Sequence, residues 1–311
     1  MQHNSIANFT IGVSGRYTMT RVKDGQPVES ITFNNLITDA GLTQLLIGSN
    51  QTNTLAVGTG TSTPTATDVS LQQRVAYTTA KESYSATYNA ATGSIDSTAT
   101  YIFPVGAIQT NITEVGLFAV NYNYIDTTPI FSRSLIKDGN GNPTSITVLA
   151  DEQLYVAYTV SLYPGEVDYQ NATVGDYNVI VRPAHARTAS ATPEAGLAWG
   201  TMQYGNLTSW NSYLQYNNTT RLSASDITDA TSSPTYAHLG SGISSYEQIS
   251  PGVVQFTTVV SPTAGNVPEG IRSICIVGGI GVIQIGFTPN IPKTADDRLT
   301  LKYTVTMTRR G

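Results

Sequence analysis

Charge is scarce in this chain. Asp, Glu, Lys and Arg make up only 12% of its 311 residues, against about 25% in typical soluble domains. The net charge is −5, and the longest basic run is the pair Arg309-Arg310. A nucleic-acid partner requires a dense basic surface that neutralises phosphates, so we expect no such partner.

Cysteine and long apolar runs are also missing. The single cysteine, Cys275, excludes an intrachain disulfide, and its apolar neighbours predict a buried strand position. No apolar run approaches about 18 residues, so we expect no membrane insertion. The first ten residues do not join a basic segment to an apolar one, so we expect no signal peptide.

Residues that favour strands and turns take the place of the missing charge. Thr, Ser, Asn and Gly are abundant, and they favour strands, turns and polar but uncharged surfaces. The 18 Tyr outnumber the 7 Phe, which suits half-exposed sheet faces and interfaces. The composition therefore predicts a mainly β protein.

Two similar stretches end two long β-like regions. Residues 151–163 read DEQLYVAYTVSLY and residues 296–308 read DDRLTLKYTVTMT. Apolar residues alternate with polar ones in both, which predicts strands with one buried face. The alternating apolar positions are Leu154, Val156, Tyr158, Val160 and Leu162 in the first copy, and Leu299, Leu301, Tyr303, Val305 and Met307 in the second.

Further echoes precede these closing strands in the same order. They are the pairs Asn35-Leu36 and Asn206-Leu207, residues 57–60 and 239–242, and residues 112–117 and 271–276. We therefore predict two tandem antiparallel β-sandwich domains related by internal duplication. They span residues 1–165 and 166–311, with a boundary between Pro164 and Gln170 and one short helix each.

Local signals predict one hairpin and two helices. Asp24-Gly25 between two strand-like runs is typical of a hairpin turn. Thr38 is suited to cap a helix that ends at Gly48. The second helix is expected over residues 208–216, after Asn206-Leu207.

Motifs that suggest ligand chemistry have simpler structural interpretations. Gly58-Thr59-Gly60 lacks the Lys of a phosphate-binding loop, so we expect a structural turn. The segment from Asp138 to Asn142 resembles the start of a calcium loop, but Pro143 and Leu149 occupy the positions that need Gly and Glu. A hairpin turn is therefore favoured there.

We expect no catalytic residue, cofactor or metal. The acid pairs Asp151/Glu152 and Asp296/Asp297 stand where the closing strands begin, so we expect architectural roles. No Gly-x-Ser-x-Gly elbow is present. The three histidines are far apart and do not form a metal-ligand cluster with one cysteine. A polysaccharide-cleaving enzyme stays an alternative, and it would need two carboxylates about 5–10 Å apart in a groove.

Aromatic residues cluster between positions 199 and 216. Rings among Asn, Ser and Thr can form a glycan platform or an interface hot spot. The candidate contact residues are Trp199, Tyr204, Trp210, Tyr213 and Tyr216. The alternative interpretation places Trp210, Tyr213 and Leu214 on the buried face of the second predicted helix.

Several segments of the first half resemble virion proteins of tailed bacteriophages. They are residues 33–42 (FNNLITDAGL), 57–60 (VGTG), 63–71 (TPTATDVSL), 130–138 (IFSRSLIKD) and 148–154 (VLADEQL). The resemblance covers about residues 10–163. It implies an assembly protein of the tail, neck or fibre attachment region, without catalytic residues.

Two functions follow from this resemblance and from the composition. The first is a structural virion subunit: a collar, adaptor or fibre-anchoring protein, made in the host cytoplasm, that contacts other tail, portal or fibre proteins. Phage parts are commonly cyclic homo-oligomers, so a ring or a trimer is expected. The alternative is a receptor-binding tail-fibre or tailspike-like module that recognises host surface polysaccharide through the aromatic segment around Trp199.

Overall fold

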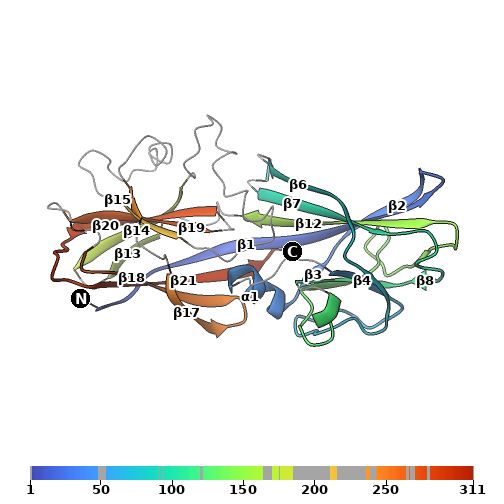
Figure 1. The fold of residues 1–311 in the computed structure, drawn as a ribbon, viewed down its shortest axis with the longest axis horizontal. Coiled ribbons are helices and arrows are strands. Elements are labelled where there is room, and N and C mark those ends of the chain that lie inside the picture. The colour runs from blue at the N-terminus through green and yellow to red at the C-terminus, as the bar shows by residue number, and fades with distance from the viewer. Residues whose placement is uncertain are drawn as a thin grey trace. The chain divides into compact units, whose positions relative to one another are not determined.

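The structure is a computed structural model. It describes residues 2–47, 54–89, 91–92, 94–119, 122–163, 170–174, 176–184, 211–215, 236–238, 243–263, 266, 270–278 and 281–310. These residues form 21 β-strands, one α-helix and one 3-10 helix, which confirms the mainly β prediction (Figure 1).

Contacts divide the chain into two compact units, each with residues from both ends of the sequence. The N-terminal unit comprises Val13–Asn89, Ile95–Leu162 and Arg309–Gly311. The C-terminal unit comprises Met1–Gly12, Ala90–Ser94 and Tyr163–Thr308. The long first strand therefore contributes to both units.

Most elements of the first half belong to the N-terminal unit. They are β1 (Gln2–Lys23), β2 (Gln26–Asn34), β3 (Leu36–Ile37), α1 (Asp39–Ile47), β4 (Thr54–Gly58), β5 (Arg74–Thr78), β6 (Lys81–Asn89), β7 (Ser94–Phe103), β8 (Asn111–Ile112), β9 (Glu114–Phe118), η1 (Tyr122–Tyr124), β10 (Ser132–Leu135), β11 (Ile146–Thr147) and β12 (Gln153–Tyr163). One sheet joins β2, β1, β12, β7 and β6, and a second has the order β3-β10-β9-β4-β5. The short strands β8 and β11 pair separately.

Side chains from the two sheets of the N-terminal unit meet in its core. Tyr17 on β1 shares a 2.7 Å hydrogen bond with Ser132 on β10. The Tyr158 ring on β12 lies 4.7 Å from the Tyr17 ring and meets Phe131 edge-on at 6.2 Å. Tyr17, Phe131 and Tyr158 are all buried, so aromatic packing joins the two layers.

The predicted hairpin and first helix are confirmed. Asp24 and Gly25 have φ values of 51° and 74°, and they connect β1 to β2 in a turn that requires positive φ. The Thr38 hydroxyl accepts a 3.0 Å hydrogen bond from the Gly41 N–H, which is the N-cap of α1. The helix packs Leu42, Leu45 and Leu46 into the core.

Both closing strands have the predicted alternation. In β12 the positions Leu154, Val156, Tyr158, Val160 and Leu162 are buried. In β21 (Leu299–Arg309) the positions Leu299, Leu301, Tyr303, Val305 and Met307 are buried. Each strand has 11 residues. A period of two therefore identified correctly which face of each strand lies against a core.

The C-terminal unit contains two sheets. Its strands are β13 (Gln170–Val174), β14 (Tyr177–Ala184), β15 (Asn211–Gln215), β16 (Tyr236–His238), β17 (Ile243–Ser250), β18 (Val253–Val260), β19 (Ile271–Gly278), β20 (Gly281–Ile291) and β21. One sheet runs β13-β14-β20-β19-β15-β16, and the other contains β17, β18, β21 and β1 in that order (Figure 1).

The helix predicted over residues 208–216 is wrong for the part that the structure describes. Asn211–Gln215 is strand β15, which pairs with β16 and β19. The spacing of Trp210, Tyr213 and Leu214 fits a helix face, but a run this short does not distinguish helix from strand. Pairing on both sides decides the conformation instead. Among the described residues, no helix has the length and apolar character needed to cross a membrane.

Candidate functional site

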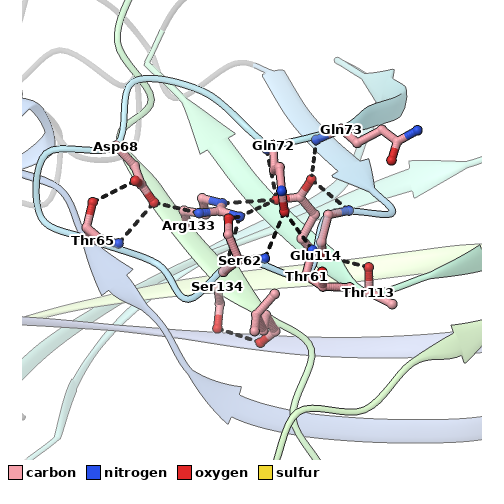
Figure 2. A network of polar contacts seen from close by, with 12 residues as sticks. Thr61, Ser62, Thr65, Asp68, Gln72, Gln73, Thr113, Glu114, Arg133 and Ser134 are labelled. Carbon is pink, nitrogen blue, oxygen red and sulfur yellow. Dashed lines mark hydrogen bonds and ion pairs between the residues drawn. The ribbon is translucent and has the colours of Figure 1, made fainter.

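The N-terminal unit contains a buried network of hydrogen bonds and ion pairs around Arg133 (Figure 2). Arg133 on β10 donates from Nε to Glu114 Oε2 at 3.0 Å, and its Nη2 lies 2.9 Å from the same oxygen. On the opposite side, Nη1 donates to Asp68 Oδ2 at 2.7 Å. Nη2 also donates to the Ser62 hydroxyl at 2.9 Å. The guanidinium is thus bound at all three of its nitrogens.

The Glu114 carboxylate binds backbone as well as charge. Glu114 is the first residue of β9, and its side chain is fully buried. Oε1 accepts from the N–H groups of Gly60 at 3.1 Å and Gln73 at 2.7 Å. Oε2 accepts from the Gln72 N–H at 3.1 Å. A buried carboxylate needs such a set of donors to offset its lost hydration.

Asp68 closes the other end of the network. Its Oδ1 accepts from the Thr65 hydroxyl at 2.7 Å, and its Oδ2 accepts from the Thr65 N–H at 3.0 Å. Burial opposes the ionisation of Asp68, but the hydrogen bonds from Thr65 and Arg133 outweigh it and lower its pKa below the ordinary value. The ionised form is therefore the form that the fold stabilises.

Two glycines permit the close approach of this network to the backbone. A Cβ at Gly58 would lie 2.3 Å from the Gln73 carbonyl oxygen and 2.6 Å from Glu114 Oε1. A Cβ at Gly60 would lie 2.4 Å from Glu114 Oε1. All three distances are far below van der Waals contact. The Gly58-Thr59-Gly60 motif therefore makes room for a carboxylate of this chain, where β4 ends at Gly58.

The network fixes the segment between β4 and β5. Residues 59–73 have no regular secondary structure, yet their backbone is bound at several points. Thr61 and Ser62 donate their N–H groups to Gln72 Oε1 at 2.7 and 2.8 Å. The Thr113 hydroxyl donates to the Gly60 carbonyl at 2.7 Å. The result is a loop whose backbone is hydrogen-bonded around two buried charges, Glu114 and Arg133.

The acid pairs at the closing strands also make structural contacts. Arg21 Nη1 donates to both carboxylate oxygens of Glu152, at 3.0 and 2.9 Å. Leu149 N–H donates to Glu152 at 3.0 Å, and this bond together with Arg21 lowers the Glu152 pKa. The Lys23 ammonium lies 2.6 Å from Asp151 and lowers its pKa. These acids hold the start of β12 against the β1–β2 hairpin.

The corresponding acid at β21 serves a turn. Asp297 Oδ2 accepts from the Thr294 hydroxyl at 2.8 Å and from the Thr294 N–H at 3.1 Å. These two bonds lower the pKa of Asp297. Of the pair Asp296/Asp297, Asp297 therefore has a structural role, because it stabilises the turn that precedes β21.

The calcium-like segment is a closed turn. Asp138 Oδ1 accepts from the N–H groups of Asn140 and Asn142, both at 2.9 Å. These backbone bonds, first that of Asn142, lower the Asp138 pKa. A bridge between Lys137 and Pro143 closes the turn. The flanking strands do not form the predicted hairpin, because β10 pairs with β3 and β9 whereas β11 pairs with β8.

Most of the predicted contact residues lie outside the part of the chain that the structure describes. These are Trp199, Tyr204, Trp210 and Tyr216. Tyr213 lies on β15, where its backbone is directly opposite His238 on β16 and Cys275 on β19. Adjacent strands are about 4.8 Å apart, so β16 and β19 are separated by about 10 Å at this row.

No group of three or more His, Cys, Asp or Glu residues arranged to hold a metal occurs within the described ranges. The absence of catalytic residues, cofactors and metals stays a prediction from the sequence.

Sequence reasoning did not assign a role to Arg133, Glu114 or Asp68. A signal was nevertheless present, because Glu114 and Arg133 are single charges inside apolar strand-like runs of a chain with few charges. Such charges are almost never buried unless they are paired. Which residues pair could not be read from the sequence, because Asp68 and Arg133 are 65 positions apart.

No protein-family model, no curated protein and no solved structure matches the chain.

Proposed function

We propose that this chain is a structural subunit of a tailed-phage virion that acts by assembly, as a collar, adaptor or fibre-anchoring protein of the tail or neck. The observation that carries this proposal is the buried charge network, whose side chains bind other residues of this chain. Arg133 and Glu114 bind each other, and both also hydrogen-bond residues of the 59–73 loop. That use suits a rigid subunit whose function is the shape of its surfaces.

The composition supports the same proposal. A surface rich in Thr, Asn and Tyr and poor in charge is suited to broad protein interfaces, because charged residues are depleted at interface cores. The resemblance of residues 10–163 to tailed-phage virion proteins indicates the kind of particle, a tailed-phage virion. The protein would contact other tail, portal or fibre proteins and copies of itself in a ring or trimer.

We also propose that the two units are β-sandwiches that arose by duplication. The matched closing strands β12 and β21 support this, since both have 11 residues and bury alternate positions. In the N-terminal unit, the contacts of Tyr17 with Ser132 join two sheets in the manner of a sandwich. The proposal no longer includes a helix over residues 211–215.

Imaging tests the function directly. Particles produced by the genome that encodes this chain would be imaged at subunit resolution. A closed ring packed among portal, tail or fibre proteins is the expected result. An outward-projecting trimer with residues 166–311 at its tip would favour receptor binding, and Trp199→Ala should then weaken adsorption while Tyr77→Ala does not. Particles that contain no copy of the chain would overturn the proposal.

A further inference from the structure

Strand β17 of the C-terminal unit has an unusual exposure. It lies at the end of its sheet, and β18 is the only described strand that pairs with it (Figure 1). Residues 245–250 are all exposed, although the neighbouring β18 buries every second residue. Two large apolar side chains, Tyr246 and Ile249, are each 55% exposed. An edge strand of this kind is a template for pairing with another strand.

A row of aromatic rings runs across this sheet and ends at the exposed edge. Tyr303 on β21 is directly opposite Phe256 on β18, and Phe256 is directly opposite Tyr246 on β17. The ring centroids are 5.5 Å and 6.4 Å apart along the row. Phe256 and Tyr303 are buried, whereas Tyr246 is mostly exposed. Tyr246 is therefore the last ring of the row, and it is exposed at the edge of the sheet.

We propose that β17 pairs antiparallel with β17 of a second copy of this chain, with Tyr246 opposite Tyr246 of the partner subunit. A symmetric antiparallel pair has its two-fold axis perpendicular to the sheet, so one residue always faces its own copy. When that residue is Tyr246, the aromatic row continues from one copy into the other. Directly opposed aromatic residues are among the stabilising cross-strand pairs.

Charge selects this register over its neighbour. With the axis at Tyr246, the only charge of the strand, Glu247, lies opposite Ser245 of the partner subunit. With the axis at Glu247, two carboxylates would be directly opposed, which is destabilising. The net charge of −5 per chain is small for 311 residues and opposes association only weakly.

The geometry of β17 limits the length of the pairing. Its register with β18 shifts between Ile243 and Ser245 and again between Gln248 and Ser250. Such irregularities blunt an edge strand. The regular stretch between them is Ser245–Gln248, with Tyr246 inside it. We therefore expect a short pairing that forms a concentration-dependent dimer.

The first test measures the mass of the purified full chain by light scattering and sedimentation over a range of concentrations. The wild type should shift from monomer towards dimer. Tyr246→Lys would place two ammonium groups directly opposite each other, so it should stay a monomer with an unchanged circular dichroism spectrum. The matched control is Tyr77→Lys, an exposed position on the edge strand β5 of another sheet, and it should associate as the wild type does. A wild type that is monomeric throughout, a Tyr246→Lys variant that still dimerises, or a Tyr77→Lys variant that does not would each overturn the proposal.

The second test fixes the register by disulfide formation in a Cys275→Ala background. Directly opposed residues have Cα atoms about 4.5–5.5 Å apart, within the range of about 4.4–6.8 Å that a disulfide spans. A mixture of the single variants Ser245→Cys and Glu247→Cys should form a covalent dimer on mild oxidation, and neither variant should do so alone. Crosslinking of Glu247→Cys with itself, or no crosslinking in the mixture, would contradict the pairing. Both tests use the isolated chain, so their outcome does not depend on the proposed virion function.

Discussion

The Arg133 Nη2 atom lies 2.9 Å from Glu114 Oε2, with the two side chains only 3% and 0% exposed. They come from neighbouring antiparallel strands, in which Arg133 pairs with Gly116 and Leu135 pairs with Glu114. Removing one member of such a pair leaves the other charge buried without that partner in a low-dielectric environment. The stability of the 59–73 loop, and of the sheet behind it, should therefore depend on this one relationship.

Substitution of Glu114 tests that dependence. Glu114→Ala should lower the free energy of unfolding by about 3–5 kcal/mol. Arg133 would keep only Asp68 as a counter-charge, and the N–H groups of the 59–73 loop that bind Glu114 would lose their acceptor. Urea unfolding followed by circular dichroism measures the loss, and hydrogen exchange should localise it to β9 and the 59–73 loop. The matched control is Asp126→Asn, which breaks the exposed ion pair with Arg74. It should change stability by less than about 1 kcal/mol. Equal effects of the two variants would contradict the importance of the buried pair.

Gly58 is a second sensitive point. Gly58→Ala would place a methyl group 2.3 Å from the Gln73 carbonyl oxygen, so we expect a loss of about 1–3 kcal/mol from overpacking. Thermal denaturation measures it. Gly139→Ala is the control, since nothing lies within 4 Å of a Cβ at that position. A Gly58→Ala protein as stable as Gly139→Ala would show that the network tolerates displacement.

Acid should destabilise the N-terminal unit through Asp68. The pKa of Asp68 is lower in the folded chain than its ordinary value, so its contribution is complete above the ordinary pKa and is lost as the pH falls towards the folded pKa. Stability should therefore decline below about pH 5. Asp68→Asn removes this titration, so its stability should vary less between pH 6 and pH 3 than that of the wild type. The same pH dependence in both proteins would exclude Asp68 as a contributor.

The cap of α1 provides a further prediction. The Thr38 hydroxyl accepts from the Gly41 N–H and donates to the Ile130 carbonyl. Thr38→Ala should cost about 1 kcal/mol from the lost cap, with a further loss because the buried Ile130 carbonyl loses its donor. Thr38→Ser keeps the hydroxyl and should retain most of the stability in the same urea titration. If Thr38→Ser were as unstable as Thr38→Ala, the methyl group rather than the hydroxyl would be the stabilising feature.

The local features of the fold could be predicted from the sequence. The alternation in residues 154–162 and 299–307 marked two strands and their buried faces, because a strand has a side-chain period of two. Asp24-Gly25 marked a hairpin, because its turn needs positive φ. Thr38 marked a helix start, because its hydroxyl satisfies an otherwise unpaired N–H. Each of these signals lies within a few residues of the structure that it predicts.

Features that depend on distant residues were decided by the tertiary structure. Asn211–Gln215 is a strand because β16 and β19 pair with it, although its own spacing suited a helix. Arg133 acts as the centre of a network because folding brings Asp68, Ser62 and Glu114 around it. The sequence alone determined which segments alternate, turn or begin a helix, since those preferences are local. The tertiary structure decided which strands pair and which charges meet, since these contacts join residues that are remote in the chain.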